Sequence, residues 1–423
     1  MTDEPTTGDP APDEPTTGDP APTGPTSTDG RTPDPAVDAW HRFCDRLAAL
    51  GDEILSDDYP GSPRARAEGV RHLATQAVGW LSWAVGHADD THPAFFRQND
   101  LVVRWGGPNV DQTTRRARLD PAGTYRIAGK MHACEDFVLT VKNGDMHQDR
   151  YGILTEVTAS ELGIAEGDEF EIVLGGPAQP DRWIELHPDA TMVNIREYYF
   201  DWRPAEPATI TIERLDTCGS GGTVLTAAAI ADQLDDAATT IEHSIRYWNR
   251  WVEERRASIG INVLGPPGGT AGGSRAIAYS FGFWSLADDE VLLFDSDAPD
   301  AAFWDLQLYT LGWFETPDFA NHVTSANHTQ AGLDADGRLR VVIGARDPGR
   351  RNWLDTEGRP EGMITYRWIR PRTTPTASTA NLQKVRLDEL DDVLGELSVT
   401  ITPDERAAQV AARQAHIAWR YRS

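Results

Sequence analysis

The chain has 423 residues and a formal charge of −27, from 66 acidic and 39 basic residues. Such an acidic surface repels phosphate backbones, which argues against a nucleic-acid partner. No run of about eighteen apolar residues occurs and no apolar run follows Met1, so we expect neither a membrane span nor a secretory signal. Cys44, Cys134 and Cys218 are too scattered for a disulfide framework or a zinc–cysteine site, and a reducing cytoplasm fits them best.

The N-terminal segment is a tandem repeat of low complexity. Residues 3–12 read DEPTTGDPAP, and residues 13–22 repeat this segment unchanged. Its Pro, Thr, Asp and Gly residues cannot bury enough apolar surface to offset the entropy lost on ordering. We therefore expect residues 1–36 to form a disordered acidic tail, which is either a solubilising segment or the product of repeat slippage in a tolerant terminus.

Residues 37–98 are expected to form a helical hairpin. In its first half apolar residues recur at steps of three and four, which is typical of one face of an amphipathic helix. These residues are Trp40, Phe43, Leu47, Leu50 and Ile54. Ser62 suits the N-cap and Pro63 the first position of a second helix that runs to about residue 87.

Two sets of short, turn-bounded strands follow, which predict a mainly β fold with added helices. Residues 99–222 are expected to form a first unit and residues 274–399 a second. Each is expected to be an antiparallel β-sandwich or a jelly-roll-like unit, because the strands are short and closely spaced along the chain.

Two further helices are predicted. One links the β units within residues 223–262, since residues 224–256 carry a helical pattern that no Gly or Pro interrupts. The other lies within residues 400–423, where Thr402 is suited to the N-cap and acidic residues occupy the first turn.

A long polar loop, residues 346–362, is predicted inside the second β unit. It is far longer than a tight hairpin requires, and long loops on a rigid strand scaffold often hold binding groups. The loop is therefore either part of a binding site or a polar plug that closes one end of the unit. In both cases we expect Asn352 and Asp355 to be buried or half-buried over Trp353, because the loop must satisfy its backbone groups.

The same loop carries a family resemblance. The segment DPGRRNWLDTEGRPEG at 347–362, followed by MITYRW, resembles the signature of the domain of unknown function 1214 family. Residues 106–129, 170–202 and 303–349 fit the same resemblance, with Val110 where the family usually has proline. The similar blocks together cover about residues 100–370. The resemblance implies a mainly β fold in a bacterial family that often occurs with domain of unknown function 1254, and little about activity.

Polar groups at the ends of strands form the predicted site. Buried charges must be paired and hydrogen-bonded, so the arginines among them need carboxylate partners such as Asp111, Asp347 or Asp355. Arg196 and Glu197 are adjacent on a predicted strand, so their side chains must point to opposite faces. The candidate binding residues are Asn109, Asp111, Arg196, Arg346, Asn352, Asp355, Arg367, Trp304 and Trp353. They are expected to bind a small polar or anionic organic molecule, unless they are only a network of structural salt bridges.

Two classes of function remain open. The first is an enzyme that acts on a small organic substrate, with His328 and Asp347 as acid–base groups in an aromatic pocket. The second is a non-catalytic binding or structural β protein, for which carbohydrate is a reasonable ligand because tryptophan stacks on sugar faces. A pocket in which His328, Asp347 and Asn352 meet would favour the enzyme. The sequence leaves room for a homo-oligomer.

A metal site is a weaker alternative. Asp145, His147 and Asp149 alternate along the chain, with His132 and Glu135 nearby, and alternation on a strand would place three ligands on one face. The segment also has the composition of a turn, where exposed polar residues need no metal. Nucleophile-elbow, Walker and dinucleotide motifs are absent from the sequence. We therefore expect no bound metal and no cofactor.

Overall fold

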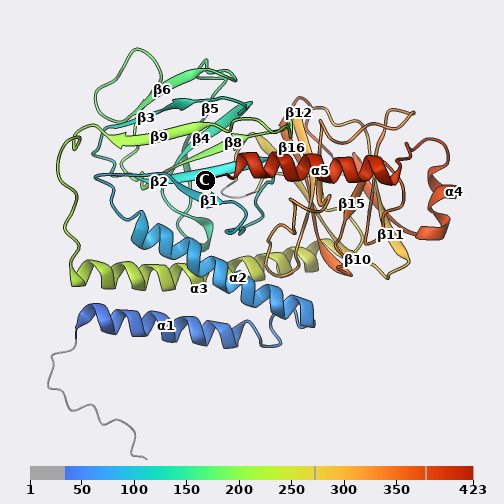
Figure 1. Cartoon of the computed structure of the whole chain (residues 1–423), viewed down its shortest axis with the longest axis horizontal. Helices are drawn as coiled ribbons and strands as arrows, with labels where there is room; N and C mark the ends of the chain where they lie inside the picture. The colour runs from blue at the N-terminus through green and yellow to red at the C-terminus, as the bar shows by residue number, and fades with distance from the viewer. Residues whose placement is uncertain (1–33, 271–272, 377–378, 423) are drawn as a thin grey trace, which may run out of the picture. The chain divides into compact units, whose positions relative to one another are not determined.

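Two β-sandwiches and four long helices account for most of residues 34–270, 273–376 and 379–422, the part of the chain that the computed structural model describes (Figure 1). Residues 1–33 of the predicted tail lie outside these ranges. The fold is mainly β with added helices, as the spacing of the short strands predicts.

The first sandwich consists of a five-stranded and a four-stranded sheet. The five-stranded sheet has the order β1 (Phe96–Asn99), β2 (Gln112–Arg118), β8 (Met192–Tyr198), β4 (Asp136–Lys142), β5 (Ile153–Thr158). The four-stranded sheet has the order β7 (Trp183–Ile184), β6 (Glu169–Leu174), β3 (Tyr125–Lys130), β9 (Thr209–Arg214). Neighbouring strands are antiparallel except β6 and β7, which are parallel.

The second sandwich consists of two four-stranded sheets. One has the order β10 (Ile277–Ser285), β16 (Glu361–Pro371), β12 (Ala301–Tyr309), β13 (Ser325–Asn327). The other has the order β15 (Trp353–Asp355), β14 (Leu339–Gly344), β11 (Glu290–Ser296), β17 (Ala380–Arg386). Here β14 and β15 are the parallel pair. The predicted loop 346–362 thus contains a short strand of its own, because its middle returns to the edge of the sheet.

Five α-helices lie within the described residues, and two of them begin at the predicted caps, Ser62 and Thr402. The five helices are α1 (Pro35–Glu53), α2 (Pro63–Leu81, continued by a π-turn at Ser82–Gly86), α3 (Ala227–Ile259), α4 (Leu390–Leu394) and α5 (Pro403–Arg420), with 3-10 turns at Met146–Gln148 and Leu387–Glu389. The side-chain oxygens of Ser62, Thr226 and Thr402 accept hydrogen bonds from the first turns of α2, α3 and α5. Helices α1 and α2 pack on α3. Trp40, expected on the buried face of α1, is half exposed because α3 covers only part of that helix.

The three cysteines form no disulfide with one another. Cys44, Cys134 and Cys218 are free thiols, and only Cys134 is buried. Among the described residues, no helix combines the length and the apolar character needed to cross a membrane.

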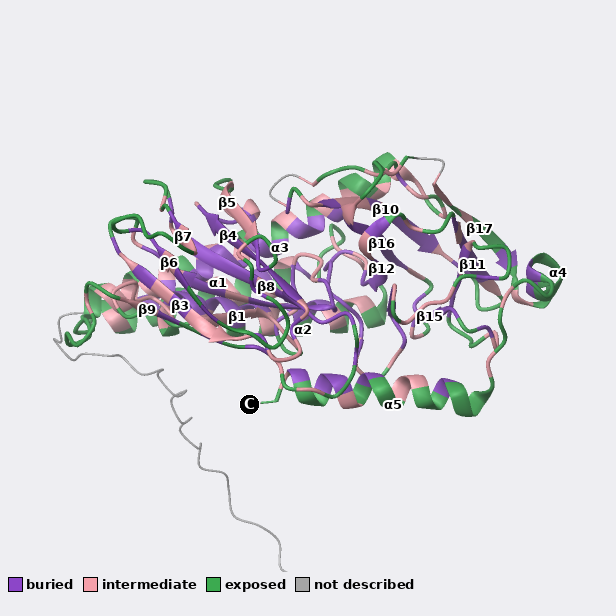
Figure 2. Ribbon diagram, turned by 90° about the horizontal axis from the view of Figure 1, so that it is seen from above, coloured by how far each residue is buried: buried purple, intermediate pink, exposed green. Residues whose placement is uncertain are grey.

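The central strands β2, β8 and β4 of the five-stranded sheet are mostly buried (Figure 2). The two faces of the sheet differ in chemistry. One face is mainly apolar and packs into the core of the first sandwich, although it also carries the paired Arg115 and Glu197. Its residues include Phe137, Leu139, Val141, Val193 and Ile195. The other face carries Thr140, Lys142, Asn194 and Arg196, since side chains alternate along each strand. A buried polar face of this kind must be satisfied by neighbouring groups or by a ligand.

A buried polar network joins the two sandwiches. Arg367 on β16 donates to Asp305 on β12, with 2.8 Å between Nη1 and Oδ1. Asn109, in the loop before β2, donates to the other carboxylate oxygen of Asp305 over 2.9 Å and accepts from Gln307 over 2.7 Å. Arg367 also donates to the hydroxyl of Tyr309 over 2.6 Å. The network therefore holds residues 107–111 against the large sheet of the second sandwich.

Charge in this network is stabilised by pairing. Burial opposes the charge of Arg367, but Tyr309 and Asp305 raise the pKa of the guanidinium above its usual value. Burial also raises the pKa of Asp305, and the Arg367 charge acts in the opposite direction. Removal of either partner leaves the other as an uncompensated buried group.

Asp305→Ala should destabilise the protein by about 3–5 kcal/mol, because Arg367 would keep a buried charge without its partner. Urea unfolding monitored by tryptophan fluorescence measures this loss. Asp300→Ala is the control, since Asp300 pairs with Arg372 on the surface and an exposed pair contributes at most about 1 kcal/mol. Equal losses in the two variants would contradict a special role for the buried network.

Candidate functional site

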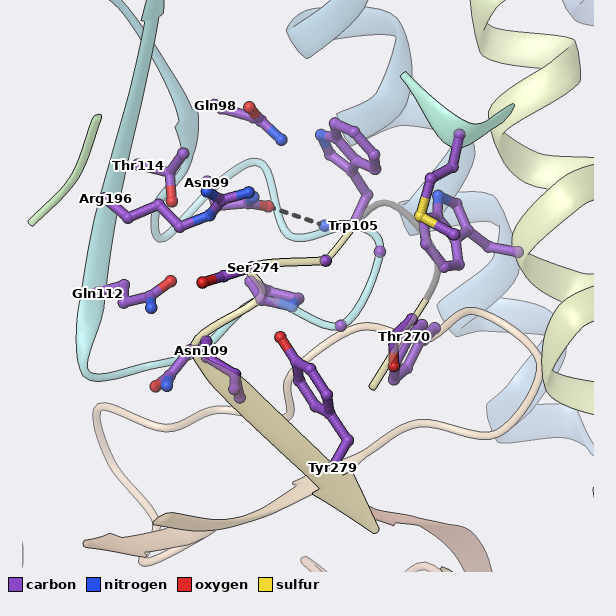
Figure 3. A pocket seen from close by; sticks show the side chains of 18 of the residues that line it. Gln98, Asn99, Trp105, Asn109, Gln112, Thr114, Arg196, Thr270, Ser274 and Tyr279 are labelled. Atoms are coloured by element: carbon purple, nitrogen blue, oxygen red, sulfur yellow. Dashed lines mark hydrogen bonds between the residues drawn. The ribbon is translucent and has the colours of Figure 1, made fainter. Parts of the chain in front are cut away.

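A central cavity of about 170 Å³ lies where the five-stranded sheet, α3 and the second sandwich meet (Figure 3). Its walls come from β2, β8 and β4, from the loop at residues 105–109, from α3, and from β10 and β16. It forms here because the polar face of the five-stranded sheet approaches aromatic residues on α3 and β10.

One side of the cavity is polar. It is formed by Gln98, Asn109, Gln112, Thr114, Arg196 and Tyr279. Thr114 and Arg196 are cross-strand partners on β2 and β8, so their side chains lie on the same face. Gln112 is two residues before Thr114 and shares that face. The side chains of Gln112 and Arg196 extend into the same space, and the hydroxyl of Tyr279 points toward it (Figure 3).

Arg196 is the least satisfied charged group of this wall. Its one hydrogen bond to a described residue goes to Oγ1 of Thr140 over 3.4 Å, and no described carboxylate lies within 4.0 Å of it. Its sequence neighbour Glu197 points to the opposite face, where it pairs with Arg115 and accepts from Tyr199 over 2.6 Å. The expectation that these two charges face opposite ways is confirmed. Glu197 thus has a partner of opposite charge, whereas Arg196, which faces the cavity, has none among the described residues.

The other cations that line the cavity are already paired. Lys142 lies 3.3 Å from Asp145, which also accepts from Arg116 over 2.8 Å. Burial raises the pKa of Asp145, but Arg116 and Lys142 outweigh it and hold that pKa below its usual value. Arg367 is bound to Asp305. Arg196 therefore supplies the unpaired positive charge of the cavity.

The opposite wall is aromatic. It is formed by Trp105, Trp248, Trp251, Phe281 and Phe314. Trp251 stacks on Phe314 with 5.0 Å between ring centroids and meets Phe281 edge-on at 5.2 Å. The indole N–H of Trp248 is buried and has no partner among the described residues. These rings hold one another in place and leave a donor on the apolar wall.

Glycine is required where the loop at 105–109 meets this wall. Gly107 has φ +65°, and a Cβ there would lie 2.2 Å from the ring of Phe314. A side chain at Gly107 would therefore push Phe314 away from Trp251. The loop is fixed by the hydrogen bond from Gly107 N to Phe314 O, 2.9 Å long.

Asp111 lies on the far side of the same loop from the cavity wall. It accepts from Trp202 Nε1 and from Asn327 Nδ2, each over 2.8 Å, and its other carboxylate oxygen has no partner among the described residues. Burial and the nearby charge of Asp305 raise the pKa of Asp111 to about 7, although the hydrogen bonds from Asn327 and Trp202 lower it. The group therefore changes charge near neutral pH.

The structure divides the predicted binding residues between several places. Asn109, Arg196 and Arg367 line the central cavity, and Asp111 lies behind it. Trp304 is in the core of the second sandwich. Asn352 and Trp353 line a separate cavity of about 220 Å³ beside α5.

The residues of the predicted loop behave largely as expected. Asn352 is buried and donates to Gly332 O and Arg340 O over 2.7 and 2.9 Å. Asp355 is half-buried and lies 2.7 Å from Nδ1 of His322. Trp353 is buried and donates to Gly344 O. Arg346, in contrast, is exposed.

His328 and Asp347, the predicted acid–base pair, are not among the described residues that line the central cavity. His328 packs against Phe200 and Phe303 at 5.3 and 5.1 Å, and burial lowers the pKa of its imidazole. Asp347 is exposed and binds Arg406 of α5 over 2.9 Å. Asn352 lines the cavity beside α5 without either of them. His328, Asp347 and Asn352 therefore do not meet in the central cavity or in the cavity beside α5.

The segment proposed as an alternative metal site is a helical turn. Residues 146–148 form a 3-10 turn rather than a strand, so the alternation of polar residues does not place them on one face. His147 is buried against Trp80 and Trp105, and burial lowers its pKa to about 4. Within the described residues, no cluster of three or more metal-ligating side chains occurs.

The predicted site residues include none of the aromatic wall, and they omit Gln98, Gln112, Thr114 and Tyr279 from the polar side. Trp248 and Trp251 were available as a signal, because a spacing of three places both on one side of α3. Tyr279 and Phe281 alternate on β10 and so share a face. Each pair is equally typical of residues packed in a core. Only the tertiary structure, which places these residues around the same cavity as Arg196, distinguishes them from core residues.

Residues 284–373 match the model of the DUF1214 family, described as a protein of unknown function. The chain belongs to this family. It is similar to an uncharacterised protein from Burkholderia cenocepacia whose crystal structure is known, with 31% identity and a TM-score of 0.77 over 84% of this chain and 98% of that chain. The VPA0106 protein from Vibrio parahaemolyticus is 10% identical, with a TM-score of 0.43 over 75% of this chain and 98% of that one. No curated protein matches the chain.

Asp111→Asn should flatten the dependence of stability on pH. The pKa of Asp111 is raised in the folded protein, so the folded state holds a proton that the unfolded state releases between about pH 4 and pH 7. Its stabilisation is complete below the unfolded pKa and is lost as the pH rises through the folded value. Each pH unit in this window should cost the wild type up to about 1.4 kcal/mol relative to the variant.

Unfolding free energies of wild type and Asp111→Asn, measured in urea at several pH values, test this expectation. Asparagine keeps the oxygen that accepts from Trp202 and Asn327. A constant difference between the two proteins from pH 4 to pH 8 would contradict it.

Proposed function

We propose that the protein binds a small anionic organic molecule in the central cavity. The observation that carries the proposal is Arg196, a half-buried guanidinium that faces the cavity and has no carboxylate within 4.0 Å among the described residues. A guanidinium is costly to remove from water unless it is paired, and a bound anion would pair it.

The charge balance of the walls supports an anion. Lys142, Arg196 and Arg367 line the cavity, against one lining carboxylate, that of Asp145. Asp305 balances Arg367 from behind the wall, and Arg116 adds another cation beside Asp145. The cavity is thus net positive in a chain with a formal charge of −27.

The neutral groups of the cavity also favour a ligand that accepts hydrogen bonds. The amide of Gln112 and the hydroxyl of Tyr279 have no hydrogen-bond partners among the described residues. Burial raises the pKa of Tyr279, so its hydroxyl remains a donor at neutral pH. Together with Arg196 and the indole of Trp248, these groups present more free donors than acceptors.

A neutral carbohydrate is the second candidate. It is favoured by the tryptophans of the aromatic wall, because an indole can stack on the face of a sugar. A sugar would leave the charge of Arg196 unpaired, which makes it the weaker candidate. Acid–base catalysis by His328 is not part of the proposal, since this residue is not among the described residues of the cavity wall.

Arg196→Gln should weaken binding of an anionic ligand by roughly 10- to 150-fold, because a hydrogen bond to a charged group contributes about 1.5–3 kcal/mol. A thermal-shift screen of organic carboxylates, organic phosphates and neutral sugars identifies the class that stabilises the wild type. Titration calorimetry then measures the loss of affinity in the variant.

Arg126→Gln is the matched control, because Arg126 is also a strand arginine but lies on the surface with Glu171 and Glu213. It should bind as the wild type does. Anion binding that survives Arg196→Gln would contradict the proposal. Stabilisation by neutral sugars alone would replace it with the carbohydrate candidate, and no response to any compound would favour a structural role.

A further inference from the structure

The central cavity has the size of one small ring. Its volume of about 170 Å³ is close to the roughly 150 Å³ of an engineered apolar cavity that binds benzene. Drug-sized ligands need pockets of about 300 Å³ or more, so a nucleotide or an oligosaccharide is too large to be enclosed here.

The aromatic wall suits a flat, unsaturated body. Trp251 and Phe314 are stacked at 17°, Phe281 is edge-on to Trp251 at 86°, and Trp248 is tilted against Phe314 at 54°. These rings already pack by offset stacking and edge-to-face contact. A further aromatic ring gains the same quadrupole interactions, whereas a saturated ring of similar size gains only apolar contact.

The polar wall suits a single carboxylate. A guanidinium presents a planar pair of N–H donors that matches the two oxygens of a carboxylate. Lys142 is paired with Asp145 and Arg367 with Asp305, so Arg196 remains as one unpaired positive charge. One unpaired cation balances a monoanion. A phosphate monoester carries about −1.5 to −2, and its second charge would have to be balanced by Lys142 or Arg116, both of which are already bound to Asp145.

We propose that the ligand is a carboxylate on a single aromatic ring, with the carboxylate at Arg196 and the ring against the wall of Trp248, Trp251, Phe281 and Phe314. This inference rests on the proposed binding of an anion in the same cavity and adds its chemical class. Benzoate is the simplest probe of this class. The hydroxyl of Tyr279 and the amide of Gln112 extend toward the same space and supply further donors to the carboxylate oxygens (Figure 3).

Titration calorimetry of the full-length protein with four matched probes tests the class. Benzoate should bind roughly two- to ten-fold more tightly than cyclohexanecarboxylate, which has the same charge but no aromatic ring. Benzamide, which is neutral, should bind at least about ten-fold more weakly than benzoate. Phenyl phosphate, which keeps the ring and adds charge, should also bind more weakly than benzoate.

Two variants assign the effects to the two walls. Arg196→Gln should abolish the preference for benzoate over benzamide. Phe281→Leu should reduce the preference for benzoate over cyclohexanecarboxylate, since three rings of the wall remain, and should leave the preference over benzamide unchanged. Urea unfolding of both variants verifies that they fold. The probe series on the wild type needs neither variant, so the inference stays testable if one of them is unstable.

The inference is overturned if benzoate does not bind, if cyclohexanecarboxylate or benzamide binds as well as benzoate does, or if phenyl phosphate binds more tightly. A different anion that binds in an Arg196-dependent manner, without benzoate binding, would overturn the aromatic carboxylate alone and leave the proposed function standing. Benzoate binding that Arg196→Gln does not weaken would overturn both.

Discussion

The buried pair of Asp305 and Arg367, which are cross-strand partners in the second sandwich, is the anchor to which the loop of the first sandwich binds. Both groups are almost fully buried, so each charge is tolerable only with the other in place. Asn109 uses the remaining oxygen of Asp305 to bring the loop before β2 onto the second sandwich. The same loop contributes Asn109 and the two glycines before Pro108 to the cavity wall. The same residues therefore join the sandwiches and shape the cavity.

The alternation of side chains on the five-stranded sheet explains why the cavity is polar on one side. A sheet between two apolar layers would need apolar residues on both faces, and this sheet has them mainly on one, with only a few such as Val138 and Tyr198 on the other. Its other face meets α2, α3 and the second sandwich with arginine, lysine, threonine and amide side chains. Most of these are paired within the protein, as Arg116 and Lys142 are with Asp145. Arg196 is the exception, and its side chain lines the central cavity.

The electrostatics of the cavity oppose those of the molecule as a whole. An acidic surface lowers the concentration of anions around the protein, whereas a net positive cavity with low-dielectric walls attracts them once they are close. In the proposed function, charge acts together with size and shape, because the aromatic wall and the volume of about 170 Å³ match a single ring. The raised pKa of Asp111 behind the loop adds a charge that changes near neutral pH close to this site.

Local sequence determined the elements of this protein, and tertiary structure decided what those elements do together. Caps at Ser62 and Thr402 and the unbroken pattern before residue 256 identify the helices, because capping and periodicity act within a few residues of chain. Strand alternation likewise predicts that Arg196 and Glu197 face opposite ways. It does not say that Glu197 finds a partner of opposite charge in Arg115 while Arg196 finds none among the described residues, because those surroundings depend on contacts between distant segments. For the same reason the polar loop at 346–362 was predicted as a site, although its residues mainly form hydrogen bonds with one another and with the neighbouring backbone. Trp251 and Tyr279, which were not predicted as site residues, face the cavity.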